Sequence, residues 1–152
     1  LFIMEATASA VNEFTSNNAA TGAGPSLSAT GGDTNVDINL IPKGTGGVNI
    51  QGTLITSETT TLSGAGAIPI TGAIAELTSG AADVMTVADG VEGQRLTCVH
   101  VTDGGSCIVT PANRGGYATV TLTAAGDTCE LLFTNSAWYV TAVGGITPGV
   151  VA

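Results

Sequence analysis

Basic side chains are scarce in this sequence. Lys43, Arg95 and Arg114 are its whole complement of Lys and Arg, against twelve Asp and Glu, and the formal net charge is −9. A chain this acidic repels phosphate backbones and anionic lipid headgroups within a Debye length. We therefore expect neither nucleic acid nor a membrane surface as a partner.

Long apolar runs are also missing. The mean hydropathy of +0.41 is high, but Ala, Val and Ile dispersed along the chain account for it. Nowhere do about 18 apolar residues follow one another, as a membrane-spanning helix requires. The sequence predicts no membrane span.

Charged residues make up only 10% of the chain, whereas Gly occupies 22 positions and Thr is frequent. Gly costs a helix about 1 kcal/mol relative to Ala, and β-branched Thr loses side-chain freedom there. Thr and Val suit the pleated surface of a sheet instead. The composition predicts an all-β fold.

Cysteine is sparse, and the three thiols of Cys98, Cys107 and Cys129 cannot all pair within one chain. None has the spacing of a zinc site. We expect buried free thiols, because free Cys behaves as a small hydrophobic residue, and a disulfide is the alternative. Strand alternation places the three cysteines on the same faces as Leu96, His100, Val109, Leu131 and Phe133.

Catalytic residues are hard to find. The single histidine, His100, lies between Val99 and Val101 in an expected strand. No Ser-Asp or Cys-Asn spacing completes a triad around it, and one histidine cannot build a zinc site by itself. The sequence predicts no enzyme and no cofactor.

The carboxylates are scattered, and Asp83, Asp89 and Glu92 form the only local group. Oxygen ligands suit Ca²⁺, but this spacing matches no EF-hand loop. We expect a solvated acidic rim and no metal site.

Residues 1–47 are rich in Asn, Ala, Ser, Thr and Gly and poor in large apolar residues. Strand alternation is visible at 26–29 and at 35–41, where Val36, Ile38 and Leu40 share one face. So few core residues cannot offset the loss of conformational entropy. We expect an extended assembly arm that is ordered by another chain or by a larger surface.

Residues 48–79 read as a connector of short strands. The expected strands are 48–51, 53–56, 59–62, 68–71 and 73–78. Pro69 has no backbone N–H for a ladder, which places its strand at a sheet edge or the strand start there.

Residues 80–145 predict a β-sandwich domain, because strand-like runs recur at the 8–12-residue spacing typical of one. The expected strands are 84–87, 94–101, 106–110, 117–123, 128–133 and 138–143. Asp89-Gly90, Asp103-Gly104 and Asn135-Ser136 mark turns between them, and Asp-Gly pairs suit tight hairpins. Because hairpin turns join antiparallel strands, we expect successive strands of this domain to pair antiparallel. Residues 146–152 form an apolar tail with no partner strand in the pattern.

Trp138 and Tyr139, with Tyr117 and nearby acids, could form a platform for a sugar ring. Alternation turns only one of Trp138 and Tyr139 outward, and a core position for Trp138 is the more ordinary outcome.

Two stretches resemble structural proteins of tailed bacteriophages, especially marine phages. The first runs from Ala8-Ser-Ala-Val-Asn-Glu-Phe14 through Asn18-Ala-Ala-Thr-Gly22, Pro25-Ser-Leu-Ser-Ala-Thr-Gly31 and Asp33-Thr-Asn-Val36 to Leu40-Ile-Pro-Lys-Gly-Thr-Gly46. It is similar to a segment of phage tail-fibre and virion-surface proteins. The second resembles their β-rich terminal domain and comprises Thr61–Pro69, Met85–Gln94, Asp103–Gly105, Thr110–Pro111, Gly126–Asp127 and Asn135–Trp138.

The resemblance implies a non-enzymatic homotrimer on the virion surface, assembled in the host cytoplasm. Its partners would be copies of itself and the major capsid protein or other virion proteins. Threefold packing would let Val36, Ile38 and Leu40 meet their symmetry mates and bury apolar surface at about 25 cal/mol per Å². We expect the arm to precede an antiparallel, jelly-roll-like sandwich.

The choice among virion roles rests on length. With 152 residues there is little room for the shaft and anchor of a receptor-binding fibre, so a capsid decoration or cement protein, or a short surface spike, is favoured. The alternative is a tail-fibre tip or adhesin-type module that binds a host surface glycan through Trp138, Tyr139 or Tyr117. A depolymerase would need an acid pair and a long repetitive β-helix, which the sequence does not show.

Overall fold

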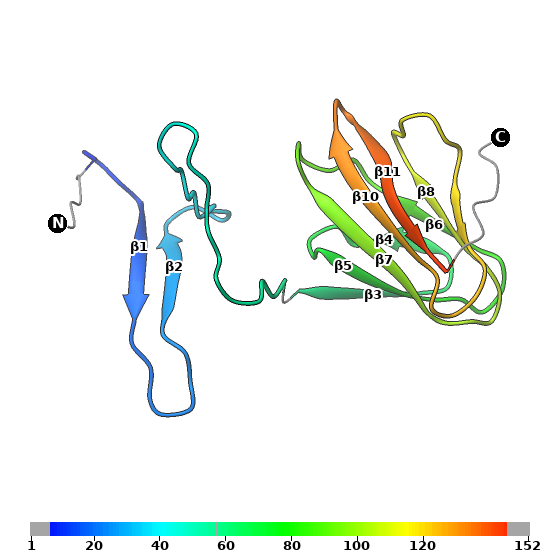
Figure 1. Ribbon diagram of the computed structural model, residues 1–152, viewed down its shortest axis with the longest axis horizontal. Coiled ribbons are helices and arrows are strands. Elements are labelled where there is room, and N and C mark those ends of the chain that lie inside the picture. The colour runs from blue at the N-terminus through cyan, green and yellow to red at the C-terminus, as the bar shows by residue number, and fades with distance from the viewer. Residues whose placement is uncertain (1–6, 57, 146–152) are drawn as a thin grey trace. The chain divides into compact units, whose positions relative to one another are not determined.

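The computed structural model describes residues 7–56 and 58–145, and within them it contains β-strands and turns but no helix. The all-β prediction is confirmed. The chain divides into two compact units, Leu1–Thr53 and Leu54–Ala152, which Figure 1 shows at the blue and the green-to-red ends of the colour scale. We describe each unit by itself.

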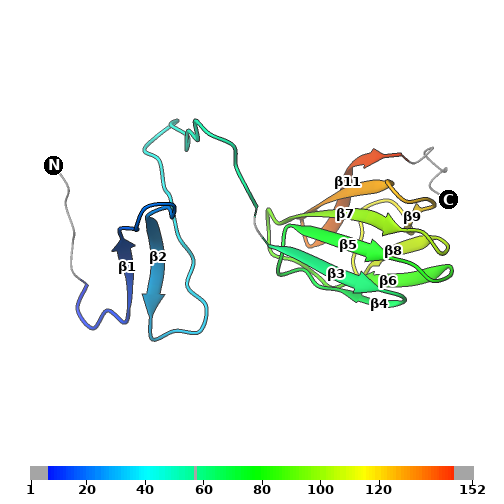
Figure 2. The ribbon, with the colours of Figure 1, turned by 90° about the horizontal axis from the view of Figure 1, so that it is seen from below.

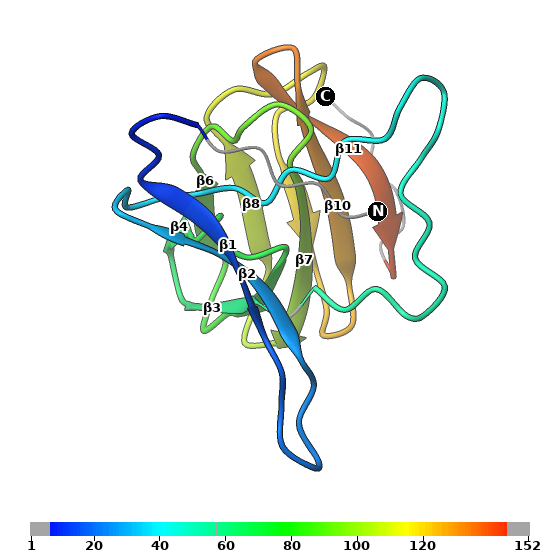
Figure 3. The same cartoon turned by 90° about the vertical axis from the view of Figure 1, so that its left-hand side faces the viewer.

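The part of the first unit that the structure describes, residues 7–53, contains one antiparallel hairpin. Strand β1 (Asn12–Asn17) pairs with β2 (Ser26–Gly31) along its full length, and the two strands run side by side toward the hairpin tip in Figure 3. The strand expected at 26–29 is confirmed, whereas the sequence pattern does not predict β1. Residues 32–56 form no strand, so the strands predicted at 35–41, 48–51 and 53–56 are wrong. Alternation favours an extended backbone, but a strand also needs a neighbour to pair its amides, and the described part of the chain supplies none there.

The second unit is a sandwich of a five-stranded and a four-stranded sheet, which Figure 2 shows with their strands side by side. The five-stranded sheet has the order β11-β10-β7-β5-β3. Its strands are β3 (Thr59–Ser63), β5 (Ile74–Thr78), β7 (Arg95–Thr102), β10 (Thr128–Thr134) and β11 (Ala137–Gly144). The four-stranded sheet has the order β4-β6-β8-β9. Its strands are β4 (Gly66–Ile68), β6 (Asp83–Val87), β8 (Cys107–Pro111) and β9 (Val120–Leu122).

The chain crosses from one sheet to the other after each strand from β3 to β7. As a result β3, β5 and β7 are parallel neighbours in one sheet, and β4, β6 and β8 are parallel neighbours in the other. This winding resembles three turns of a β-solenoid. Only β9, β10 and β11 add antiparallel pairs to the described part of this unit.

The prediction of an antiparallel sandwich is therefore wrong for β3 to β8. The turn at Asp103–Gly105 does not close a hairpin between β7 and β8. It carries the chain from the five-stranded to the four-stranded sheet. Crossing between the sheets from β3 to β8 gives each of these strands an opposing layer against which its inner face is buried. Hairpin pairing within two sheets would bury the same faces.

The predicted connector at 48–79 is also wrong, because β3, β4 and β5 are integral strands of the sandwich. Ala75 and Leu77 of β5 are fully buried between β3 and β7, so the sandwich begins at residue 59 and not at 80. The strand expected at 68–71 spans 66–68 instead, and Pro69 directly follows it, outside the ladder. This strand, β4, lies at the edge of its sheet. The predicted tail at 146–152 lies outside the described residues.

The inner faces of both sheets form one hydrophobic core. Trp138 is fully buried in it, meets the Phe133 ring edge-on with centroids 5.2 Å apart, and donates from Nε1 to the Ala88 carbonyl at 2.9 Å. The other large members of this core are Leu77, Met85, Val87, Leu96, Val109, Leu122 and Leu131.

The β10–β11 hairpin follows a turn that the sequence predicts. Asn135 and Ser136 have φ of 51° and 59°, and positive φ at both central positions defines the type I′ turn that fits the twist of two strands. This hairpin places Trp138 directly opposite Phe133.

Candidate functional site

Within residues 7–53, the first unit exposes nearly all of its large apolar side chains. None of residues 7–53 is buried, and Ile41 is 87% exposed. Among the described residues of this unit, the exposed large apolar ones are Val11, Phe14, Leu27, Ile38, Leu40, Ile41, Val48 and Ile50. Folded monomers rarely leave so much apolar surface in one segment, and such surface typically marks an interaction site.

The β1–β2 hairpin is amphipathic. Phe14 lies opposite Ala29, and Leu27 lies on the same face. On the other face the hydroxyl groups of Thr15 and Thr30 form a hydrogen bond, with 2.7 Å between the two oxygens. Phe14 and Leu27 are 51% and 56% exposed, so the apolar face has no covering layer within the described part of this unit.

The open end of the hairpin is fixed by Asn12 and Asp33. The Asn12 amide donates to the Asp33 carboxylate at 2.7 Å, and the Asp33 N–H donates to the Asn12 side-chain oxygen. Gly31 has a φ of 148°, and a Cβ there would lie 2.2 Å from the Val11 carbonyl oxygen. Only glycine fits this close approach, so the end of the hairpin has a defined shape.

The three residues predicted to make trimer or capsid contacts follow the hairpin. Val36 is half-buried, whereas Ile38 and Leu40 are exposed. They lie in an extended segment without strand pairing. The structure leaves two of them available for a partner, and their contact role stays a prediction.

The aromatic platform is not assembled. Trp138 is fully buried, so its predicted role in binding a glycan is wrong. The half-buried Tyr139 ring lies against Gly115, where a Cβ would approach Cε1 to 2.2 Å. Tyr117 packs against the core with its hydroxyl buried, and burial raises its pKa to about 12. The alternation argument that only one of Trp138 and Tyr139 turns outward is confirmed.

A buried polar cluster surrounds Ser79 at the end of β5. Its Oγ contacts His100 Nε2 at 2.9 Å, donates to the Gly105 carbonyl and accepts from the Gly104 N–H at 3.2 Å. His100 Nε2 also lies 3.0 Å from the Thr102 carbonyl oxygen. A carbonyl can only accept, so we assign the ring hydrogen to Nε2.

This pairing is not a catalytic triad. His100 Nδ1 is buried without a hydrogen-bond partner, whereas a catalytic histidine has an acid there. Ser79 is buried and its hydrogen is directed to a backbone carbonyl. The cluster fixes the turn that carries the chain between the sheets. Sequence reasoning missed it, because Ser79 lies far from His100 in the chain and only the parallel β5–β7 pairing brings them together.

The carboxylates of the predicted acidic rim serve three separate turns. Asp83 accepts from the Gly80 N–H at 2.9 Å, Asp89 accepts from the Asn113 amide at 2.8 Å, and Glu92 accepts from the Asn135 N–H at 3.0 Å. Among the described residues no three His, Cys, Asp or Glu side chains gather in a way that could hold a metal ion.

All three cysteines are buried free thiols, as the sequence predicted. Cys98 and Cys129 are cross-strand partners on β7 and β10. A hydrogen bond with Cys129, followed by burial, raises the pKa of Cys98 well above its usual value. Burial also raises the pKa of Cys107, although the Ser79 hydroxyl counteracts part of this.

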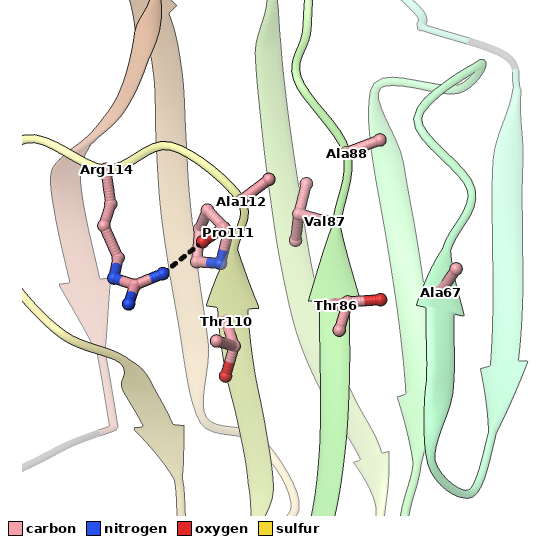
Figure 4. Close-up of a pocket in the computed structure, with 8 residues that line it drawn as sticks. All are labelled: Ala67, Thr86, Val87, Ala88, Thr110, Pro111, Ala112 and Arg114. Atoms are coloured by element: carbon pink, nitrogen blue, oxygen red, sulfur yellow. Dashed lines mark hydrogen bonds between the residues drawn. The ribbon is translucent and has the colours of Figure 1, made fainter.

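A shallow hollow of about 320 Å³ lies on the four-stranded sheet and continues past the ends of β6 and β8. Figure 4 shows Ala67, Thr86 and Thr110 on successive strands, with Arg114 at the rim donating to the Pro111 carbonyl at 2.6 Å. Its other lining residues, Val87, Ala88 and Ala112, are apolar. The lining offers surface for contact but no thiol, imidazole or carboxylate that could activate its threonine hydroxyls.

Comparison with known proteins gives no relative: no family model, curated protein or solved structure matches the chain. A search of the described residues for a helix long and apolar enough to cross a membrane finds none.

Proposed function

We propose that this chain is a non-enzymatic structural protein of a tailed-phage virion, a homotrimeric capsid decoration or cement protein or a short surface spike. The observation that carries the proposal is the first unit, in which no described residue is buried although its hairpin has a well-defined apolar face. The resemblance of residues 8–46 to phage virion-surface proteins supports the same role.

The thermodynamic argument is direct. Ordering one residue costs about 1–2 kcal/mol, and an isolated two-stranded hairpin is marginally stable in water. The described part of the first unit has no core to offset that cost. It requires cover from copies of the chain or from a shell such as the major capsid protein.

The second unit has the opposite character, because its two sheets enclose a complete core. A part that needs cover followed by a part that folds around its own core suits a protein that is anchored to a particle and exposes a domain. The net charge of −9 would keep neighbouring particles apart in solution. The proposed location is the virion surface, after assembly in the host cytoplasm.

Sedimentation equilibrium of the full chain tests the trimer. We expect three times the monomer mass for the unmodified protein. Leu27→Asp puts a charge on the apolar hairpin face and should shift the mass toward the monomer. Ser28→Asp adds the same charge one residue later, on the polar face, and should leave the trimer intact. A monomeric unmodified protein at micromolar concentration would contradict the proposal.

A second experiment tests the location. Mass spectrometry of purified tailed-phage particles, followed by gold labelling of intact ones with an antibody to the sandwich, should find the chain on the head, neck or tail surface. Particles that resist heat or osmotic shock less well after the protein is stripped would indicate decoration. Unchanged resistance combined with lost host attachment would indicate a fibre tip.

The glycan-binding alternative has fewer exposed aromatic residues to support it than the sequence predicted. Trp138 is buried, Tyr117 packs against the core and Tyr139 is covered on one side by Gly115. A glycan array tests this alternative, and binding that is lost in Tyr139→Ala would restore it.

A further inference from the structure

The two outer faces of the sandwich differ in charge. The outer face of the five-stranded sheet carries Glu76, Arg95 and Glu130, and the last two form an ion pair at 3.1 Å. The outward positions of the four-stranded sheet carry no charge. They are Ala67, Val84, Thr86, Ile108, Thr110 and Thr121, which we call the neutral face.

The neutral face is regular as well as uncharged. Pairing aligns Ala67, Thr86 and Thr110 in one row and Val84, Ile108 and Thr121 in a second row. Neighbouring strands lie about 4.8 Å apart, so each row presents methyl and hydroxyl groups at an even spacing. Val84 is a large apolar side chain that remains exposed within this face.

We infer that the neutral face is turned toward the threefold axis of the trimer and meets the same face of two other copies. The inference rests on the proposed homotrimer and adds the surface by which its sandwiches touch. Each copy has a net charge of −9, and like charges brought together at an axis repel strongly. The outward strand positions of the neutral face carry no charge, and Arg114 lies at the rim of the hollow beside them. This face is therefore the one that three such copies can share.

The chemistry of the face suits a copy of itself better than a different partner. A hydroxyl both donates and accepts, so Thr86 and Thr110 can bond to identical residues across an axis. A basic partner would be drawn to the carboxylates elsewhere on the chain, because the outward positions of the neutral face offer it no charge.

The area of the neutral face limits how much it can contribute to the stability of the trimer. Strand spacing and rise give it roughly 300 Å², below the approximately 800 Å² per partner of a stable interface. It therefore supplements the contacts of the first unit. Disrupting it should weaken the trimer, and need not abolish it.

The test compares two identical substitutions in the full chain. Thr110→Glu places a carboxylate on the neutral face, and Thr78→Glu places one on the outer face of the five-stranded sheet. Both threonines are half-buried strand residues, and Thr78 pairs with the uncharged Ser63 and Thr102. Sedimentation equilibrium should show Thr110→Glu dissociating at a concentration about tenfold higher than the unmodified protein, while Thr78→Glu matches it.

The outcomes separate this inference from the proposed function. A monomeric unmodified protein contradicts both. If it is a trimer and Thr110→Glu is equally stable, or Thr78→Glu is weakened just as much, the axis lies elsewhere and only the inference is overturned. Circular dichroism checks folding, and Thr86→Glu, exposed in the same row, replaces Thr110→Glu in the same comparison if that variant unfolds.

Discussion

Cys98 and Cys129 lie directly opposite each other on β7 and β10, with both side chains inside the sandwich. Neither is in a disulfide, and the hydrogen bond with Cys129 together with burial raises the pKa of Cys98 well above its usual value. The thiolate is the reactive form of cysteine, so the raised pKa protects Cys98, and burial protects both side chains. The pair packs as two small hydrophobic residues.

We therefore predict that the native protein does not react with an aromatic disulfide reagent at pH 8 within minutes. After unfolding in denaturant all three thiols should react, which is the internal control. Rapid titration of even one thiol in the folded protein would show that Cys98, Cys107 or Cys129 is more accessible than the structure has it.

Trp138→Ala should destabilise the sandwich by about 3–5 kcal/mol, the range for truncating a fully buried large aromatic side chain. The substitution removes the edge contact with Phe133 and leaves the Ala88 carbonyl without its indole donor. Chemical denaturation measures the change. Val91→Ala is the control, because Val91 is 71% exposed, and it should change stability by less than about 0.5 kcal/mol.

Local sequence pattern is sufficient where strands pair with their neighbours in the chain. The β10–β11 hairpin, its Asn135-Ser136 turn and the inward side of Cys98 all follow from alternation and turn chemistry. Pattern fails where pairing is distant. Thr59 pairs with Ile74, and Ile74 pairs with Thr97, and no local signal specifies such partners. This is why the pattern predicts a row of hairpins where the chain winds in parallel.

The candidate interface also has one part that can be predicted from the sequence and one part that cannot. The lack of large core residues in the first unit is visible in its composition, and its exposure follows from that. The neutral face is not visible there, because Thr86 and Thr110 become neighbours only when β6 and β8 pair in parallel. The alternation of apolar and polar residues at 35–41 indicates a segment with one apolar and one polar face, and so predicts a strand. Whether a strand forms also depends on a neighbouring strand that pairs with its backbone, and alternation does not report that.

Ser79→Ala should cost about 1–3 kcal/mol of stability, the range for leaving buried polar groups unpaired. It removes the acceptor of the Gly104 N–H and the donor to the Gly105 carbonyl, and deprives His100 Nε2 of one partner. Ser63→Ala is the matched control, since Ser63 is exposed on β3. Equal urea midpoints for the two variants would mean that the cluster contributes little.

Tyr117→Phe should leave stability at neutral pH unchanged or raise it by up to about 1 kcal/mol, because the deleted hydroxyl is buried without a partner. Burial raises the pKa of Tyr117 to about 12 in the folded state. As pH rises from about 10 the unfolded chain loses this proton first, so the unmodified protein loses stability that the Tyr117→Phe variant keeps. Urea midpoints at pH 8 and pH 11 should diverge in favour of the variant, and parallel changes would contradict the assignment.

Asp127 should govern part of the acid sensitivity of the sandwich. Its carboxylate accepts from the Thr123 N–H at 2.7 Å, the Ala124 N–H at 3.0 Å and the Thr123 hydroxyl at 3.1 Å. The Thr123 backbone bond is the main cause that lowers the pKa of Asp127. A folded pKa below the unfolded one gives stability that is fully present above the unfolded value and is lost as pH falls through the folded one.

Asp127→Asn should therefore destabilise the protein at pH 7, and the difference from the unmodified chain should shrink below about pH 4. Asp37→Asn removes the same charge from an exposed site in the first unit, so it controls for net charge and should leave the acid limb of the sandwich unchanged. Unfolding midpoints followed from pH 7 to pH 2 provide the measurement. If the Asp127→Asn curve runs parallel to the unmodified curve throughout, the three hydrogen bonds do not favour the ionised carboxylate, and acid unfolding originates elsewhere in the sandwich.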